Sequence, residues 1–403
     1  MRVYPFMHSS HIAVCLIAWL VGVAWLYKLL EAARGLATVP NLLGPEYDVA
    51  PAGSPSVAVI VPARNEAASV AACLESLVNQ DYGDLCVIGV DDRSTDQTGA
   101  IMDGLTHAHP ARLEVLHVTT LPANWLGKTH AMALAARHAV ATHHSDYLLF
   151  TDGDILFRHD AIRRSLAQAL ATQADHFVVL PTTIAKTCGE GMLLSYLQVL
   201  GLWAVRPWRV SDPKAMRDAI GVGAFNLIRT SVYQELGGFD AAPMEILEDL
   251  NLGHRVKRAG LRQRVATAPG MVCVHWAAGV FGLVNGMTKN LFAIFRFRPA
   301  LLLAAATLTI LFCIAPVAFL ALPATRIPGL IGLASVAGLY VLSSRTSRIS
   351  PMYAALFPIS AALLVYSMLR SMLITVLRGG VTWRGTFYPL SELRKHAGLP
   401  FWQ

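Results

Sequence analysis

The chain has 403 residues, of which 54% are hydrophobic and only 15% are charged. A soluble domain usually carries about a quarter charged residues, so this composition argues against an ordinary soluble protein and favours a membrane protein. The formal net charge of +7 suits either nucleic acid or anionic lipid. Many Arg residues flank apolar segments, and no basic stripe is interleaved with aromatic residues, so we expect a membrane and no nucleic-acid partner.

The first expected element is an apolar helix over residues 12–30. It is nearly uncharged and long enough to cross a bilayer core of about 30 Å. A cleaved signal peptide is the rival interpretation, but the run is long for one and no clear cleavage site follows. Lys28 and Arg34 lie at and beyond its end, which favours a retained anchor whose C-terminal side is cytoplasmic. We therefore assign residues 1–37 to a transmembrane anchor and residues 38–55, rich in Pro and Gly, to a linker.

Strands and helices alternate from Ser56 onward. The predicted strands are 57–61, 85–90, 113–118 and 147–151, and the predicted helices are 66–79, 95–105 and 129–141. Short β-branched runs such as the first suit strands buried on both faces. The alternation predicts right-handed βαβ units and a mostly parallel sheet. We expect an α/β, Rossmann-like domain over residues 56–279, with its ligands at the carboxyl ends of the strands.

Beyond Gly279 the chain becomes apolar again. It divides into a juxtamembrane segment (280–299), C-terminal transmembrane helices (300–378) and a basic tail (379–403). Residues 300–322 and 352–377 are long enough to span a membrane, whereas residues 327–342 form a shorter run with three Gly. Three spans would place the tail outside. Two spans would keep it inside, in better agreement with the positive-inside tendency. We expect a multi-pass protein of the inner (plasma) membrane with a cytoplasmic catalytic domain.

Acidic residues stand where two predicted strands end. Asp91 and Asp92 close the second strand, and Asp152 and Asp154 follow the fourth. Two carboxylates one residue apart in an extended turn can point the same way and form an oxygen-rich site for Mg²⁺ or Mn²⁺ on a diphosphate. A lone Asp-x-Asp also occurs as a turn or a helix cap. After an apolar strand in an α/β pattern, we favour the metal site.

Other polar residues lie at the same predicted edge. Pro62, Arg64 and Glu66 follow the first strand, where the loop caps the next helix and can also contact a nucleotide. Lys128 begins a helix and either pairs with phosphate or is a plain surface Lys. A Walker A loop is rejected because Pro122 stands where its first Gly is needed.

Two further acids, Glu248 and Asp249, lead into a predicted helix over residues 252–259. Acids are favourable at any helix N-terminus, but this pair also suggests a base that takes a proton from an acceptor hydroxyl. The 6 Cys are scattered without C-x-x-C or Cys/His zinc spacing, so we expect reduced, buried thiols.

The ordered set of these motifs resembles glycosyltransferase family 2, with the GT-A fold. The matching segments are VIVPARNE (59–66), VDDRSTD (90–96), DGD (152–154), GVGAF (221–225) and Glu248-Asp249. Within that family, LPANWLGK (121–128) is similar to hopanoid-associated and carotenoid-type glycosyltransferases, which also carry membrane segments at both ends. The segment TWRGTFY (382–388) also resembles a C-terminal segment of membrane-bound members of the family.

The resemblance implies a role for each candidate residue. The residues implied in donor binding are Pro62, Arg64, Glu66, Asp91, Asp92, Lys128 and Asp152. Asp152 and Asp154 would bind the metal, and His275 is either a further ligand or a core His. Asp249 would be the catalytic base, with Glu248 as the alternative. The implied reaction is an inverting, metal-dependent transfer of one sugar from a nucleotide sugar, with a UDP-sugar expected. The implied acceptor is a membrane lipid of hopanoid, carotenoid, polyprenyl, glycerolipid or sphingolipid type.

One departure and two rival functions bear on this interpretation. The Q-x-x-R-W motif of processive members is absent, and VHWAAG (274–279) stands in its place, which argues against a polymer-making synthase. A membrane-bound nucleotidyltransferase is the first rival, but the loop over residues 63–66 lacks the Gly- and Lys/Arg-rich character it needs. A non-catalytic scaffold is the second, against which the acids Asp152, Asp154 and Asp249 argue.

Overall fold

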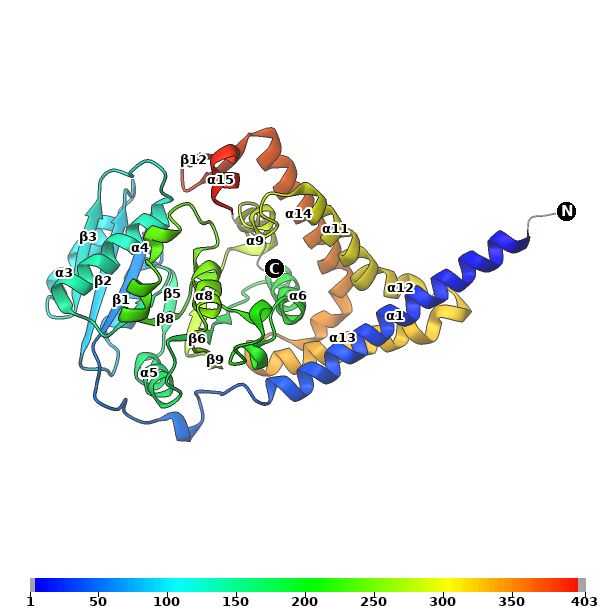
Figure 1. Ribbon diagram of the computed structural model, residues 1–403, viewed down its shortest axis with the longest axis horizontal. Coiled ribbons are helices and arrows are strands. Elements are labelled where there is room, and N and C mark those ends of the chain that lie inside the picture. The colour runs from blue at the N-terminus through cyan, green and yellow to red at the C-terminus, as the bar shows by residue number, and fades with distance from the viewer. Residues whose placement is uncertain (1–3, 398–403) are drawn as a thin grey trace. The chain divides into compact units, whose positions relative to one another are not determined.

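The computed structural model describes residues 4–397, with side chains described from residue 11 onward. The chain forms two compact units, each assembled from segments that are far apart in sequence. The α/β unit contains Val39–Ile184, Pro207–Trp276 and the segment that begins at Gly379; the helical unit contains the segment up to Thr38, Ala185–Arg206 and Ala277–Arg378. Both units are drawn in Figure 1.

A seven-stranded sheet forms the centre of the α/β unit, within the described residues, in the order β3-β2-β1-β4-β8-β6-β9. Its strands are β1 (Val57–Ala63), β2 (Leu85–Asp92), β3 (Leu113–Val118), β4 (Tyr147–Phe150), β6 (His176–Leu180), β8 (Asn226–Arg229) and β9 (Gln263–Thr267). Only β8 runs antiparallel to its neighbours β4 and β6 in this part of the chain; the other adjacent strands are parallel. The predicted mostly parallel α/β fold is confirmed.

Helices cover both faces of this sheet. They are α2 (Val70–Val78), α3 (Thr98–Ala108), α4 (Gly127–His138), α5 (Ala161–Ala171), α7 (Thr230–Glu235) and α8 (Glu248–Arg258). Side chains alternate along β1, so that Val57, Val59 and Val61 join one apolar cluster with α2, α3 and α5. Ala58 and Ile60 join the other cluster with α4, α7 and α8. β1 is buried at every position, so its sequence is a continuous apolar run, and the strand can be recognised from the sequence for this reason.

Smaller elements complete the unit. A three-stranded sheet contains β5 (Ile155–Phe157), β10 (Val272–Val274) and β7 (Thr182–Thr183), in that order. A C-terminal hairpin, red in Figure 1, pairs β11 (Gly380–Trp383) with β12 (Thr386–Pro389) and is followed by α15 (Leu390–His396). Arg384 and Gly385 have φ angles of 47° and 78°. Two left-handed residues at the loop match the twist of the paired strands, which allows this tight two-residue turn.

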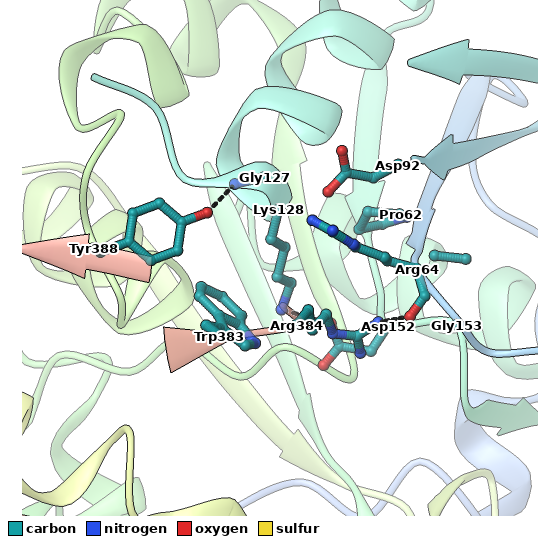
Figure 2. Close-up of a pocket in the computed structure, with 11 residues that line it drawn as sticks. Pro62, Arg64, Asp92, Gly127, Lys128, Asp152, Gly153, Trp383, Arg384 and Tyr388 are labelled. Atoms are coloured by element: carbon teal, nitrogen blue, oxygen red, sulfur yellow. Dashed lines mark hydrogen bonds and ion pairs between the residues drawn. The ribbon is translucent and has the colours of Figure 1, made fainter. Parts of the chain in front are cut away.

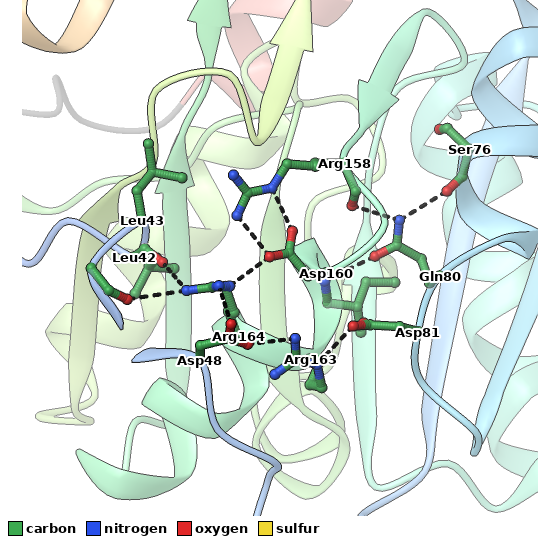
Figure 3. Close-up of polar contacts among 12 residues, drawn as sticks. Leu42, Leu43, Asp48, Ser76, Gln80, Asp81, Arg158, Asp160, Arg163 and Arg164 are labelled. Atoms are coloured by element: carbon green, nitrogen blue, oxygen red, sulfur yellow. Dashed lines mark hydrogen bonds and ion pairs between the residues drawn. The ribbon is translucent and has the colours of Figure 1, made fainter. Parts of the chain in front are cut away.

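The segment after the first apolar helix packs on the α/β unit, although its composition marks it as a linker. Leu42 is fully buried there. The guanidinium of Arg164 donates a 3.0 Å hydrogen bond to the Leu42 carbonyl, and Arg163 and Arg164 each contact Asp48 at 2.7 Å. Figure 3 shows these contacts together with Asp160, which accepts a 2.6 Å bond from Arg164. The segment is therefore held along α5.

The helical unit consists of long apolar helices and short connecting ones. They are α1 (Tyr4–Leu36), α6 (Cys188–Ala204), α9 (Gly279–Met287), α10 (Leu291–Ile294), α11 (Pro299–Thr309), α12 (Ala315–Phe319), α13 (Arg326–Ser347) and α14 (Phe357–Leu377). In the described part of the chain, 5 segments are long and apolar enough to cross a membrane: His11–Leu36, Cys188–Arg209, Pro299–Phe319, Pro323–Ser347 and Pro351–Leu377. Apolar helices in both terminal regions were predicted and are confirmed.

Two of these segments differ from the sequence-based expectation. The run over residues 327–342 is part of the full-length helix α13, whose Gly residues lower its hydropathy but permit close packing against α1. The segment Cys188–Arg209 was not predicted as a candidate span at all. Its mean hydropathy is 1.2, the lowest of the five, because it mixes polar and apolar residues.

Candidate functional site

A pocket lies at the carboxyl ends of three neighbouring strands of the main sheet. It is lined by Pro62 and Arg64 at the end of β1, Asp92 at the end of β2, Asp152 after β4, and Lys128 in the first turn of α4. Parallel strands deliver their end residues to one edge of a sheet, so these side chains converge although they are far apart in sequence. Figure 2 shows them around a common space.

Asp92 anchors one wall of this pocket. Its two carboxylate oxygens accept hydrogen bonds from Arg93 at 2.7 Å and 3.0 Å, and the side chain is almost fully buried. The start of α4 comes so close that a Cβ atom at Gly127 would collide with the carboxylate of Asp92 and the guanidinium of Arg93. A larger residue there would have to push the Asp92 carboxylate and the Arg93 guanidinium aside. This close approach places the backbone N–H groups at the start of α4, where anions bind favourably, beside the pocket.

Lys128 occupies the centre of the site. Its Nζ lies 2.5 Å from Asp152 Oδ1 and 2.6 Å from Glu248 Oε1. Burial alone would lower the pKa of Lys128, but the carboxylates of Asp152, Glu248 and Asp249 outweigh burial and hold that pKa above its ordinary value. The ammonium group therefore stays charged at neutral pH. Lys128 is not a plain surface residue, because it joins the donor pocket to the acids of α8.

Asp154 lies beside Asp152 and has hard oxygen ligands to offer. Burial first, and then the charges of Asp152 and Glu66, raise the pKa of Asp154 to about 6. Crowded carboxylates of this kind are stabilised by a divalent cation. β10 pairs antiparallel with β5, and Val274 lies opposite Ile155 at the end of that pairing, just before His275 and just after Asp154. Asp152 and Asp154 thus offer the oxygen ligands that a divalent metal ion prefers.

Glu248 and Asp249 form the first turn of α8 and line a small cavity that shares Lys128 and Asp152 with the pocket above. Burial first, and then the charge of Glu248, raise the pKa of Asp249 to about 7, although Lys128 opposes that rise. Glu248 is buried, and its Oε1 contacts Lys128. A carboxyl with a pKa of about 7, as at Asp249, can exchange a proton near neutral pH.

The remaining predicted donor residues lie outside the pocket lining. Asp91 faces the other side of β2, where its oxygens contact the His117 ring at 3.2 Å and accept a bond from the Ser94 backbone N–H at 3.2 Å. Adjacent residues on a strand point to opposite faces, so Asp91 and Asp92 cannot both face the same pocket. Glu66 lies at the pocket's rim, where it forms an ion pair with Arg384.

The C-terminal hairpin supplies three pocket residues without a predicted role, Trp383, Arg384 and Tyr388. Figure 2 shows Trp383 and Tyr388 reaching the pocket from β11 and β12. The Tyr388 hydroxyl accepts a 3.3 Å hydrogen bond from the Gly127 backbone N–H, and Arg384 donates to the carbonyl of Arg64. The available signal was the run Thr382 to Tyr388, in which aromatic and basic residues flank a Gly.

The comparisons with known proteins agree with this geometry. Residues 58–237 match the sequence model of Glycosyl transferase family 2. The α/β unit thus contains a glycosyltransferase family 2 domain, as its motifs indicated. Two similar proteins are 4,4'-diaponeurosporenoate glycosyltransferases: one of Staphylococcus haemolyticus, 26% identical over 243 residues, and one of Staphylococcus aureus, 27% identical over 241 residues. The match covers 59% of this chain and 61% or 60% of the relative's length.

A solved structure has the same fold. It is the mannosyltransferase PcManGT from Pyrobaculum calidifontis in complex with GDP-Man and Mn²⁺. Its TM-score is 0.54 at 19% sequence identity, and the alignment covers 89% of this chain and 98% of the mannosyltransferase. The GT-A fold that the strand–helix pattern and motifs predicted is confirmed.

Proposed function

We propose that this protein is an inverting, metal-dependent glycosyltransferase that moves one sugar from a nucleotide-sugar donor, a UDP-sugar, to a lipid acceptor in the membrane. The observation that carries the proposal is the continuity of the two cavities. The donor pocket at the strand ends and the cavity beside Asp249 share Lys128 and Asp152. A base that titrates near neutral pH therefore lies next to the place where a donor diphosphate would bind.

The donor side is built for a nucleoside diphosphate. Asp92 and Arg64 offer hydrogen-bonding groups to the nucleoside, and Lys128 with the start of α4 offers positive charge to the phosphates. Asp152 and Asp154, with His275 as a further ligand, would hold Mg²⁺ or Mn²⁺, which supplies charge that stabilises the departing nucleoside diphosphate. The related GT-A structure was solved with GDP-Man and Mn²⁺, which supports this arrangement.

The acceptor side is built for proton removal. Asp249 takes the proton from the acceptor hydroxyl, the acceptor oxygen bonds to the anomeric carbon, and the bond from that carbon to the diphosphate breaks. One displacement inverts the configuration. The pKa of about 7 at Asp249 supports a hydroxyl acceptor for this chain.

The helical unit supports a lipid acceptor. Its candidate spans keep the chain at a bilayer, where a hydrophobic acceptor is concentrated. Nucleotide sugars are made in the cytoplasm, so we place the α/β unit on the cytoplasmic face of the inner membrane. The missing Q-x-x-R-W motif supports transfer of a single sugar.

The direct test is a donor and acceptor screen with the full chain in detergent or lipid discs. Radiolabelled UDP-, GDP- and dTDP-sugars are each incubated with membrane lipid extract and Mn²⁺, and the organic phase is counted. We expect one labelled lipid with one UDP-sugar, and none with the Asp249→Asn variant. Label that enters a polymer, or a nucleotidyl group that is transferred, would refute the proposal.

A further inference from the structure

Four side chains with metal-ligand atoms gather at the edge of the sheet opposite the donor pocket. Cys86 is the second residue of β2 and Glu114 the second residue of β3. His138 ends α4, and His143 ends the π-helical turn Ala139–His143 that follows. Cys86 and Asp92 stand at the two ends of one strand, about 20 Å apart at 3.3 Å per residue. This cluster is therefore separate from the donor site.

The ligand atoms already lie close to the separations that a metal ion imposes. Cys86 Sγ is 3.5 Å from His143 Nε2, and that nitrogen is 3.0 Å from Glu114 Oε1. All three atoms lie within 4.8 Å of one another. Tetrahedral zinc with ordinary bond lengths separates sulfur from nitrogen by about 3.6 Å and nitrogen from oxygen by about 3.3 Å. The sulfur-to-nitrogen and nitrogen-to-oxygen separations therefore lie within a few tenths of an ångström of the values that zinc imposes.

The π-helical turn is the feature that builds this cluster. In a regular α-helix, residues five apart point about 140° away from each other. The wider turn over Ala139–His143 instead brings the rings of His138 and His143 to 5.9 Å. Such turns are rare and are frequent at functional sites. His138 Nε2 lies 2.8 Å from Glu114 Oε2, so the other oxygen of Glu114 is left to face His143.

We propose that Cys86, Glu114 and His143 bind a divalent transition-metal ion of zinc's chemistry, with His138 holding Glu114 in position. One sulfur, one nitrogen and one oxygen ligand suit zinc, whereas Mg²⁺ and Mn²⁺ prefer oxygen. On binding, the Cys86 thiol releases its proton to solvent and the sulfur becomes the ligand. Sequence spacing could not reveal the site, because its residues come from two strands and a distant turn.

Solvent reaches the cluster through a pocket lined by Asp84, Cys86, Arg112, Glu114 and His143. The pocket gives the ion an access path and a water molecule for the fourth position. Arg112 also lines this pocket, and its guanidinium donates three hydrogen bonds, to the carbonyls of Val78, Gln80 and Tyr82. The guanidinium of Arg112 is therefore directed toward these backbone carbonyls.

The test is cobalt and zinc binding to the full chain, purified in detergent and stripped with a chelator. We expect one Zn²⁺ per chain, and a Co²⁺ complex with a sulfur-to-cobalt charge-transfer band. Cys86→Ser should abolish that band, and His143→Gln should weaken Zn²⁺ binding by more than about 10-fold. His138→Gln should weaken it by about 10-fold, the effect typical of a residue that positions a ligand.

Matched controls come from exposed residues of the same types. Cys188→Ser and His107→Gln should bind Zn²⁺ as the unmodified chain does. Zn²⁺ should also raise the melting temperature of the unmodified chain and not that of His143→Gln. If Cys86→Ser fails to fold, Glu114→Gln replaces it. The proposal is overturned if the unmodified chain binds Zn²⁺ no more tightly than His143→Gln, or if the cobalt band persists in Cys86→Ser.

Discussion

Asp249 is the residue whose protonation state should control turnover, because its pKa of about 7 lies in the working range. A base must be ionised to act, so kcat/KM should decrease as the pH falls below about 7, where Asp249 becomes protonated. Asp249→Asn should lower kcat by about 10²–10⁴-fold, since loss of a positioned base has that effect. Donor affinity should change little, because Asp249 lies outside the donor pocket lining.

Glu248→Gln is the matched control for that prediction, measured beside Asp249→Asn over the same pH range. It removes a neighbouring acid that Lys128 already holds. If only Glu248→Gln loses turnover, the base is Glu248. If both variants keep near-normal turnover on a hydroxyl acceptor, neither acid is the base.

Asp154 gives a prediction about the metal. Asp154→Ala should abolish transfer and the dependence of donor binding on Mn²⁺, because Asp154 is one of only two acids proposed to hold the ion. The variant should fold, since Asp154 is half-buried in a loop and not in the core. Isothermal titration with UDP, with and without Mn²⁺, measures the effect. Unchanged transfer in the variant, or in the unmodified protein with excess chelator, contradicts the assignment.

At the residue scale, the sequence indicated which residues lie at the strand ends, but not which face of the sheet each side chain points to. Asp92 and Asp152 reach the pocket because any residue at a parallel strand's carboxyl end does so. Asp91 does not reach the pocket, because the side chains of two adjacent residues on an extended strand point to opposite faces. Local geometry decided these cases, and spacing alone does not encode it.

Among the elements, the C-terminal hairpin is the one with an unexpected role. Its Tyr388 hydroxyl satisfies the Gly127 N–H at the start of α4. Tyr388→Phe should leave that donor unpaired, which destabilises this wall of the pocket by about 1 kcal/mol or more. We expect the loosened wall to raise the KM for the donor several-fold. The acceptor KM should not change. Initial-rate kinetics with each substrate varied in turn measures both.

Phe387→Leu provides the control on the same strand, since Phe387 is 49% exposed and lies outside the pocket lining. It should keep the donor KM of the unmodified protein. Equal effects of the Tyr388 and Phe387 variants would mean that the hairpin acts only through its general stability. A Tyr388→Phe variant with normal kinetics would show that the hairpin does not contribute to the donor site.

Elements of the sheet were predictable because each depends on a run of neighbouring residues. The strand over residues 113–118 has the predicted bounds, and the helix of Glu248 and Asp249 begins only a few residues earlier than expected. The hairpin's place was not predictable in this way. Arg384 contacts the carbonyl of Arg64, 320 residues away in sequence. No local periodicity records such a contact.

At the scale of the whole molecule, the path of the chain restricts its membrane topology. The α/β unit is built from three segments, interrupted by Ala185–Arg206 and Ala277–Arg378. A folded polar unit lies on one side of a membrane, so each interruption must cross an even number of times. The first contains one candidate helix, α6, so we expect that it does not cross. The second contains three candidates, so we expect that at most two of them cross.

Cysteine labelling tests this topology in a chain with Cys188 replaced by Ser. Single thiols are engineered at Asp103 and at Ser391, which lies in α15. We expect both to react only after the membrane is permeabilised, since both belong to the α/β unit, which we propose to be cytoplasmic. Labelling of Ser391→Cys alone from outside intact cells would mean three C-terminal spans and would separate the hairpin from the sheet.

The place of the hairpin also sets the order in which the protein becomes active during synthesis. The ribosome makes every candidate span before it makes Trp383 and Tyr388. A growing chain can therefore fold its sheet and enter the bilayer while the donor pocket still lacks one wall. Under the proposed function, a sugar nucleotide would be bound fully only by a chain whose candidate spans have all been synthesised, so translation would delay donor consumption until the enzyme reaches the membrane.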